Sequence, residues 1–362
     1  MKAAIISLGS VSSQMVGDAL KNYFDEADMI QLKDIQVNLG KESGIFYQGK
    51  KLKDYDCVYV KGSFRFAHLL RSIASILELK VPYMPLAANS FTVAHNKLLT
   101  HLALEQRGIP MPKTYVTSTV AAAKELLKQV NYPIVMKFPE GTQGKGVMFA
   151  DSISSASSLL DALGALNQPF IIQEYIETGG TDVRAIVVGD KVVGAMRRKA
   201  QKEEKRSNIH AGGTGEPAKL NRELTNIALD TAKALNADIC GVDILESPLG
   251  PLVIEANVSP GLQGVSKVVP TIADDIAKFL FYKTEEVVGS KNKERTEKAM
   301  KEIALKELSG DSPLQEIITE LQFRGERILL PEIITKITKF SDRKEYALKV
   351  KKGQLEITEF KI

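Results

Sequence analysis

The sequence predicts an α/β fold with additional α+β character, divided into more than one domain. Over residues 1–85, short apolar runs alternate with stretches of helical period, a pattern typical of a parallel sheet covered by helices. Further along, apolar runs joined by Gly-containing turns predict antiparallel hairpins, among them Thr181–Val188 with Lys191–Met196. At 362 residues the chain is too long for one ordinary core, so we expect two or three domains.

The expected elements follow one another closely along the chain. Near the start, Lys2–Leu8 predicts a strand and Val11–Phe24 a helix, and the pair repeats at Asp56–Val60 and Phe64–Leu79. After these, the pattern predicts helices at 91–108, 120–129, 152–166, 220–235 and 271–282, and strands at 113–116, 133–138 and 170–175. From residue 289 the composition changes to a Lys-, Glu- and Arg-rich stretch, a solvated helix or linker, followed by an apolar helix-like stretch at 314–321 and three short strand-like runs.

Composition narrows the class of protein. A hydrophobic fraction of 44% and a charged fraction of 25% are those of a soluble globular chain, and no apolar run approaches the roughly 20 residues that cross a bilayer. The N-terminal residues suit a first strand better than a signal peptide. Cys57 and Cys240 lie in apolar segments without further Cys or His at ligand spacing, so we expect reduced thiols and a cytoplasmic location. The net charge of +4 is too small to predict nucleic-acid binding.

The stretch Gly241–Gly261 contains the most informative polar residues. Two apolar runs separated by a linker with Ser, Pro and Gly predict a hairpin. Glu255 and Asn257 are two residues apart, so they share one face of the second strand, and Asp243 on the first strand could lie opposite them. Carboxylate and carboxamide oxygens suit a hard cation such as Mg²⁺. The alternative is that these are polar groups of an edge strand that faces water.

Two lysines and a glycine-rich loop suggest an anion site. Lys137 interrupts the otherwise apolar strand PIVMKF, and a lysine in a buried strand needs an anion to meet. Directly after it, Pro139–Val147 contains three glycines, whose N–H groups could close over phosphates, although most loops of this kind are plain hairpin turns. Lys97, on the predicted helix 91–108, would by itself be read as a solvated residue.

A second group of charged residues falls on the hairpin before Gly241. Asp182 and Arg184 share a face of its first strand, and Arg197 and Arg198 end its second. The polar, Gly-rich segment at 202–215 that follows is too long for a tight turn, which favours an active-site loop.

Taken together, these segments resemble a known family. Six motifs occur in the order and at similar spacings found in ATP-grasp ligases of the RimK type: MKFPEGTQGKGV, QEYI, TDVR, RSNIHAGG, GVDIL and EANVSPGL. The resemblance is strong over residues 85–285, loose over 1–84 and absent over 289–362. It implies an ATP-grasp fold with a leading Rossmann-like pre-ATP-grasp domain at 1–88, a two-lobed ATP-grasp domain at 89–286, and a linker with a small C-terminal α+β appendage at 287–362.

The resemblance also implies roles for the candidate residues. Asp243, Glu255 and Asn257 would hold Mg²⁺, with two ions expected and Mn²⁺ as an alternative. The expected ATP-binding residues are Lys97, Lys137, Gly144, Gly146, Glu174, Tyr175, Ile176, Asp182, Arg206, Ser207 and Asn208. Arg197 is the first choice for stabilising the oxyanion and the acyl phosphate; Arg184 could do the same or pair with Asp182. The family pattern has an acid where this chain has Asn96, and Lys145 adds a charge to the loop.

The implied activity is an ATP-dependent carboxylate–amine ligase that forms an amide through an acyl phosphate and releases ADP and phosphate. The substrates would be an amino acid such as glutamate and a carboxylate acceptor, either a protein C-terminus or a small molecule. We also expect a homo-oligomer. Two alternatives stay open: a nucleotide-responsive binding protein whose C-terminal module recruits a partner, and a phosphotransferase that stops at phosphorylation.

Overall fold

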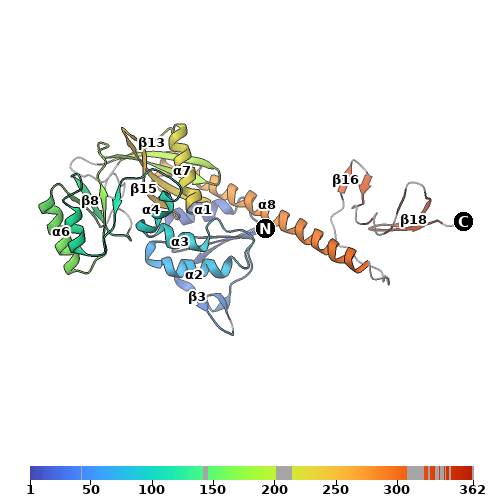
Figure 1. Cartoon of the computed structure of the whole chain (residues 1–362). Helices are drawn as coiled ribbons and strands as arrows, with labels where there is room; N and C mark the ends of the chain where they lie inside the picture. The colour runs from blue at the N-terminus through green and yellow to red at the C-terminus, as the bar shows by residue number, and fades with distance from the viewer. Residues whose placement is uncertain are drawn as a thin grey trace. The chain divides into compact units, whose positions relative to one another are not determined.

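The computed structural model describes residues 1–41, 43–141, 146–200 and 214–307, and in the C-terminal region 322–324, 327–330, 334, 338, 340–341 and 344–360. Side chains are described outside 291–307 and 322–324. The chain forms two compact units, Met1–Val288 and Gly289–Ile362 (Figure 1). Mixed helices and sheets confirm the predicted fold class. The finer division at residue 88 stays a prediction.

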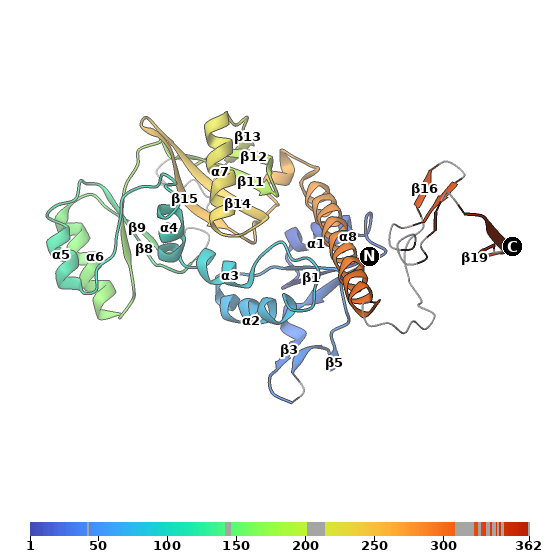
Figure 2. The same ribbon diagram turned by 45° about the vertical axis from the view of Figure 1, so that its right-hand side comes forward.

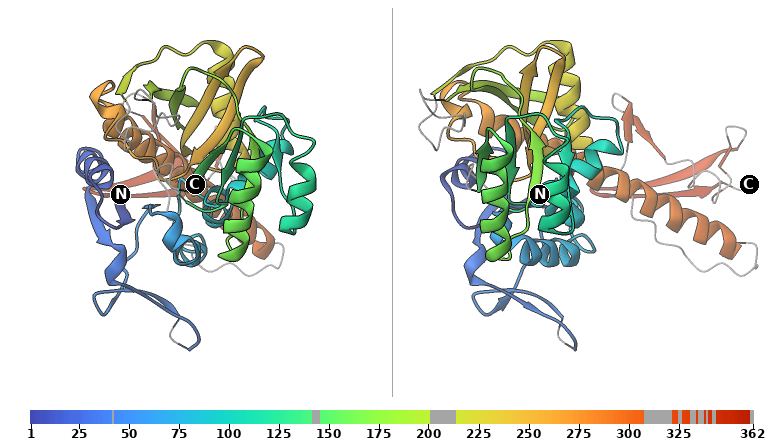
Figure 3. Two further views of the ribbon diagram at one scale, coloured as in Figure 1. Left: turned by 90° about the vertical axis from the view of Figure 1, so that its left-hand side faces the viewer. Right: turned by 60° about the vertical axis from the view of Figure 1, so that its left-hand side comes forward.

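The first unit begins with a small parallel sheet, as the sequence predicted. Its three strands are in the order β2-β1-β6, and both neighbours run parallel to the central β1. The elements of this region are β1 (Lys2–Ser7), α1 (Val11–Leu20), β2 (Glu26–Gln31), β6 (Cys57–Val60) and α2 (Ala67–Leu77), and a small antiparallel sheet of β3 (Ile35–Asn38), β4 (Gly44–Tyr47) and β5 (Lys50–Lys51). Strands β3 to β5 protrude from the rest of this unit in both views of Figure 3. The sequence pattern missed β2 and this protruding sheet.

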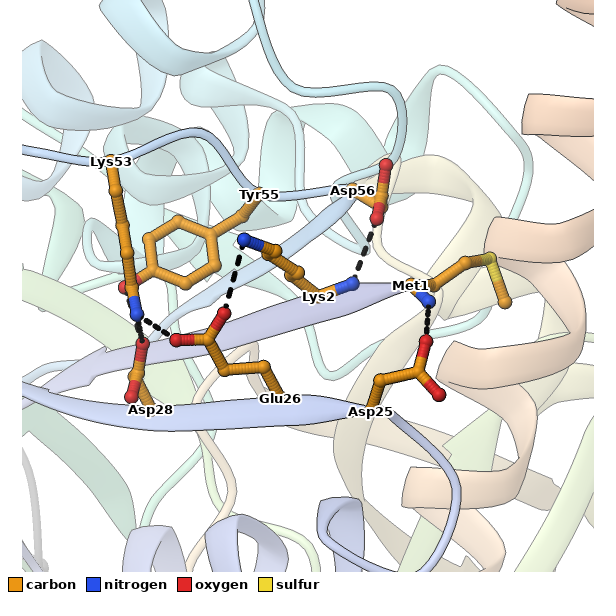
Figure 4. A network of polar contacts seen from close by, with 8 residues as sticks. All are labelled: Met1, Lys2, Asp25, Glu26, Asp28, Lys53, Tyr55 and Asp56. Carbon is orange, nitrogen blue, oxygen red and sulfur yellow. Dashed lines mark hydrogen bonds and ion pairs between the residues drawn. The ribbon is translucent and has the colours of Figure 1, made fainter.

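Charged side chains join the first residues of β1 to neighbouring segments (Figure 4). The amino-terminal ammonium donates a hydrogen bond to the Asp25 carboxylate, and the backbone N–H of Lys2 donates to the Asp56 carboxylate at 2.7 Å. Lys53 pairs with both Glu26 and Asp28, the latter at 2.7 Å. The side chains of Glu26, Asp28 and Lys53 are between about one-third and one-half exposed, so each of their ion pairs is expected to contribute little to stability.

A second sheet, of four strands, has a hydrophobic core of its own. Its order is β7-β10-β8-β9, with antiparallel neighbours throughout. Its elements are β7 (Thr114–Tyr115), α5 (Val120–Leu126), β8 (Ile134–Lys137), β9 (Val147–Ala150), α6 (Ile153–Ala165) and β10 (Ile171–Glu174). Helices α5 and α6 contact each other, α6 contacts β9, and the buried side chains between the helices and the sheet include Leu127, Met136 and Leu160.

The third sheet carries the predicted hairpins. Its order is β13-β12-β11-β14-β15, and helix α7 (Arg222–Ala234) packs on β11, β14 and β15 (Figure 2). The strands are β11 (Thr181–Val188), β12 (Lys191–Lys199), β13 (Thr214–Pro217), β14 (Ile239–Ser247) and β15 (Gly250–Asn257). The register shifts by one residue in β11–β12 after Ile186 and in β14–β15 after Asp243. Both irregularities are β-bulges, and they decide which side chains face each other.

Two of the predicted helices have different boundaries. The single helix expected at 91–108 is wrong, because the chain forms α3 (Ala88–Ala94) and α4 (Lys97–Glu105). Asn96 separates them: its side-chain oxygen accepts hydrogen bonds from the N–H groups of Leu98 and Leu99 and so starts a new helix. The last helix, α8 (Ile272–Glu307), is continuous where a shorter helix followed by a solvated helix or linker was predicted. None of the described helices is both long and apolar enough to span a membrane.

The second unit contains two antiparallel hairpins among its described residues. They are β16 (Gln322–Arg324) with β17 (Arg327–Leu329), and β18 (Tyr346–Lys351) with β19 (Gln354–Glu359). Phe340 and Tyr346 pack edge to face, with ring centroids 4.7 Å apart. The helix predicted at 314–321 lies outside the described residues.

Candidate active site

A cavity of about 520 Å³ in the first unit is lined from three of the four sheets described there. The first sheet contributes Ser7 and Lys61, the second Lys137 and Gln173, and the third the polar face of β11, β14 and β15. This volume lies within the range of sites for small ligands. Ten of the residues that the sequence singled out line it: Lys97, Lys137, Glu174, Tyr175, Ile176, Asp182, Arg184, Asp243, Glu255 and Asn257.

The hairpin β14–β15 brings the three oxygen-bearing side chains to one face. Asp243 lies directly opposite Glu255, and Asn257 lies opposite Gly241. The bulge in β15 creates this arrangement, because an uninterrupted ladder from the turn would have placed Ile254 opposite Asp243. Among the described residues neither Glu255 nor Asn257 has a side-chain hydrogen bond or ion pair that the structure records. Both residues line the cavity.

Asp243 is instead paired with two arginines. Arg184 binds it through two parallel hydrogen bonds, from Nε to Oδ1 at 2.7 Å and from a terminal nitrogen to Oδ2 at 2.6 Å. Arg198 lies 3.0 Å from Oδ2 and also makes a two-point contact with Asp182. Burial acts to raise the pKa of Asp243, but Arg184 and then Arg198 outweigh it and hold that pKa below its usual range. We call Asp182, Arg184, Arg198 and Asp243 the four-charge cluster.

Arg197 does not line this cavity. It points to the other face of β12, pairs with Glu246 at 2.7 Å and is 37% exposed. The adjacent Arg198, which the sequence reasoning did not choose, is 4% exposed and belongs to the four-charge cluster. The alternation of side chains along a strand makes the two arginines mutually exclusive at this face. Arg184 pairs with Asp243, whereas the sequence offered Asp182 as its partner.

The two predicted nucleotide lysines lie in the same cavity. Lys97 Nζ donates to the carbonyl oxygen of Gly141 at 3.1 Å, so it already contacts the start of the glycine-rich loop. Lys137 Nζ donates to Gln173 Oε1 at 2.6 Å, and Gln173 Nε2 donates to Thr114 Oγ1 at 2.9 Å. Burial lowers the pKa of Lys137 to about 8, with Glu255 opposing and Lys97 adding to the shift. The sequence missed Gln173, although FIIQEY shows a polar residue in an apolar strand.

Of the remaining predicted ATP-binding residues, the structure describes Gly146 only. Gly146 has a φ of +77°, and a Cβ there would lie 2.3 Å from the Phe138 ring, so this end of the loop requires glycine. Gly144, Arg206, Ser207 and Asn208 lie outside the described residues, as do Lys145 and most of the segment 202–215.

Comparison with known proteins shows the family of the chain. The family model of the RimK-like ATP-grasp domain matches residues 94–280. A probable alpha-L-glutamate ligase of Cellvibrio japonicus (strain Ueda107) is 35% identical over 79% of this chain and 96% of its own. The chain belongs to the RimK-like ATP-grasp family. A second probable alpha-L-glutamate ligase, from Shewanella loihica, is 34% identical over 78% of this chain and 94% of its own.

Solved structures confirm the ATP-grasp fold of this RimK-like ligase. A RimK domain protein from Sphaerobacter thermophilus covers 77% of this chain and 99% of its own, with 18% identity and a TM-score of 0.61. The ATP-grasp ligase PsnB, in a complex with minimal precursor, Mg and ADP, covers 78% and 98%, again with 18% identity and a TM-score of 0.61. The predicted family and the predicted class of enzyme, a C–N ligase, are confirmed.

The PsnB complex contains Mg and ADP, and part of the ligand set predicted for this chain fits such an ion. Glu255 and Asn257 supply oxygen atoms free of described partners, beside the lysines that would meet phosphates. Asp243 has its oxygens engaged by arginines, and no three described His, Cys, Asp or Glu side chains form a metal cluster. The role of Asp243 as a ligand therefore stays a prediction.

Proposed function

We propose that this chain joins an amino acid such as glutamate to an acceptor carboxylate, using ATP and releasing ADP and phosphate. One observation carries the proposal: Glu255 and Asn257 lie without described partners in the same cavity as Lys97 and Lys137. Oxygen ligands for a cation beside lysines for phosphates are what a triphosphate site needs. The names of the relatives at 34–35% identity support glutamate as the amino acid.

The chemical difficulty that such a ligase overcomes is the poor reactivity of a carboxylate. Its carbon is shielded by negative charge, so an amine attacks only after the γ-phosphoryl group of ATP has been transferred to the carboxylate. The resulting acyl phosphate has a leaving group, and its reaction with the amine yields an amide and phosphate. Because several anionic groups must approach one another, catalysis consists mainly of positioning and charge neutralisation.

The residues of the cavity divide this work. Lys97 and Lys137 would neutralise phosphate oxygens, and Gln173 holds the Lys137 ammonium in place through its 2.6 Å hydrogen bond. Glu255 and Asn257 would hold Mg²⁺, which when bound neutralises phosphate charge during transfer. Residues 174–176 line the same cavity and would contact the adenine, chiefly through backbone groups.

The four-charge cluster is formally neutral, but it places a fixed guanidinium, that of Arg184, on the cavity wall. The Arg184 side chain is more exposed than the nearly buried Arg198 side chain, so of these two arginines Arg184 is the more accessible from the cavity. Asp243 fixes its orientation with two hydrogen bonds. We therefore favour Arg184 over Arg197 as the group that stabilises the developing oxyanion, because a preorganised guanidinium loses little entropy when it binds one.

The reaction is tested by product analysis. Purified protein with ATP, Mg²⁺, L-glutamate and a set of acceptors ending in a carboxylate should form an amide, detected as a mass increase by mass spectrometry. ADP should accumulate only when both acceptor and amino acid are present. Formation of AMP in place of ADP would contradict the acyl-phosphate route, and ADP formation without an amide would indicate a phosphotransferase.

A further inference from the structure

Lys61 is a buried lysine of the cavity wall that the proposed chemistry does not yet use. It follows β6 directly, its side chain lines the cavity, and it is 3% exposed. Its ammonium donates a hydrogen bond to the hydroxyl of Tyr59 at 3.3 Å and lies 4.7 Å from the centroid of that ring. Among the described residues no carboxylate pairs with it, so its charge has only neutral neighbours there.

The surroundings of Lys61 differ from those of Lys53, another lysine of the first 61 residues. Lys53 is 46% exposed and pairs with two carboxylates, those of Glu26 and Asp28 (Figure 4). Lys61 is 3% exposed and has no acid partner among the described residues, and burial lowers its pKa to about 7. An ammonium in such a place is costly to the fold unless a negatively charged ligand occupies the adjoining space.

The position of Lys61 indicates where such a ligand would lie. The backbone N–H of Gly62 donates to Ser259 Oγ at 3.1 Å, and Ser259 follows Asn257 by two residues. Lys61 is therefore next in sequence to a contact with the segment that follows the predicted metal ligands. Three hydroxyl-bearing residues, Ser10, Ser13 and Ser63, line the cavity together with Lys61. A buried cation without a described acid partner, on a cavity wall that hydroxyl groups also line, is suited to an anionic ligand.

We propose that Lys61 binds a carboxylate of one of the two organic substrates at the end of the cavity next to Asn257. This inference rests on the proposed function, in which both the amino acid and the acceptor carry carboxylates. The triphosphate already has Lys97 and Lys137, which come from other segments of the cavity wall. A carboxylate matches Lys61 in charge and would restore the charge balance that the fold lacks there. Lys61 thus selects for substrates that bring a negative group to this end.

The test is a binding measurement that does not require turnover. Isothermal titration of L-glutamate and of N-acetyl-L-glutamate is performed in the presence of Mg²⁺ and the non-hydrolysable nucleotide AMPPNP. The protein is compared with Lys61→Met, which keeps the length of the side chain, Lys61→Arg, which keeps the charge, and Lys53→Met as a matched control. We expect Lys61→Met to weaken binding of at least one carboxylate by about tenfold or more, the effect of one charge-assisted hydrogen bond.

The other variants separate ligand binding from folding. Lys61→Arg should retain most of the affinity, and Lys53→Met should bind like the original protein. Thermal unfolding without ligand should show Lys61→Met to be at least as stable as the original, because a buried unpaired charge has been removed. A lysine with a purely structural role would give the opposite change in stability and no change in carboxylate affinity.

The two probes identify which substrate is bound. A loss confined to L-glutamate assigns Lys61 to the amino acid, whereas a loss confined to N-acetyl-L-glutamate, which has no free amine, assigns it to the acceptor. Unchanged affinity of Lys61→Met for both probes, or binding of neither probe by the original protein, overturns the inference. Amide formation by the original protein is measured separately, so the proposed function can fail while the Lys61 result stands, and the reverse.

Discussion

Two acids of the β14–β15 hairpin face each other across one ladder and have opposite surroundings. Asp243 is 2% exposed and its oxygens accept hydrogen bonds from Arg184 and Arg198. Glu255 is half-buried and has no recorded side-chain hydrogen bond or ion pair among the described residues, and its charge opposes the lowering of the Lys137 pKa by burial. The comparison teaches that one acid of the pair holds the protein's own cations and that the other is left for a ligand.

This difference separates stability from catalysis on a single hairpin. Removing Asp243 leaves two guanidinium groups without their carboxylate inside the protein, a large cost for folding. Removing Glu255 leaves no described partner unpaired, so the folded state loses little and the ligand loses its contact. The predictions below test this separation.

The largest expected effect is on the turnover of Glu255→Ala. Without this carboxylate the phosphate charge is not neutralised during transfer, and we expect kcat to fall by about 1000-fold or more. Thermal unfolding of the variant should stay close to that of the original protein. Amide formation is measured by mass spectrometry with saturating ATP, and Glu255→Asp serves as the control that keeps the charge. ATP turnover at the original rate in Glu255→Ala would refute the predicted role of Glu255.

The corresponding change at Asp243 should act mainly on folding. We expect Asp243→Ala to lower the free energy of unfolding by about 3–5 kcal/mol, the range for breaking a buried ion pair from one side. Denaturant unfolding measures the loss, and Glu255→Ala on the facing strand is the matched control. Equal stability of the two variants would show that the arginines find other partners and that Asp243 is no more important for folding than Glu255.

The hairpins themselves could be predicted from the sequence, because apolar runs around Gly-containing turns are a local signal. The pairing across them could not be. Counting back from the turn of β11–β12 without interruption would place Arg197 opposite Asp182, but the bulge after Ile186 places Arg198 there. One extra residue reverses which side chains face the cavity, and nothing in the apolar pattern marks the position of the bulge.

Other parts of the site depend on contacts between distant segments. The leading parallel sheet and most helices followed from their periodicity, but the break between α3 and α4 depends on the capping hydrogen bonds of Asn96. Lys61 lies beside a contact between Gly62 and Ser259, which is 197 positions further along the chain. A single sequence carries no signal for such a contact. The order of the six motifs predicted the family, and the resemblance to a family implies a whole fold without an account of each contact in it.

A smaller effect is expected from pH, through Lys137. Its pKa of about 8 in the free protein is below the value of 10.5 for an exposed lysine, so Lys137 loses its charge as the pH rises through 8. Phosphates bind the charged form, and affinity for AMPPNP should be highest below pH 8 and fall above it by up to about tenfold per pH unit. Lys137→Arg keeps its charge over this range and should flatten the profile. Titrations from about pH 7 to 9.5 measure it; an unchanged profile in Lys137→Arg would assign the dependence to another group.

The smallest effect should come from a change at Arg197. Arg198, the next residue of the same strand, is its matched control because it points to the opposite face. The Arg197–Glu246 pair is more than one-third exposed on both sides, and surface pairs of this kind contribute about 0–1 kcal/mol. Arg197→Met should therefore change the stability little and keep turnover within about threefold, whereas Arg198→Met leaves Asp182 and Asp243 without a shared cation and should be strongly destabilised. Denaturant unfolding and amide formation are measured on both variants. A large loss of turnover in a stable Arg197→Met protein would mean that the β12 register changes when substrates bind, because only a shift of one residue brings Arg197 to the face of Asp182.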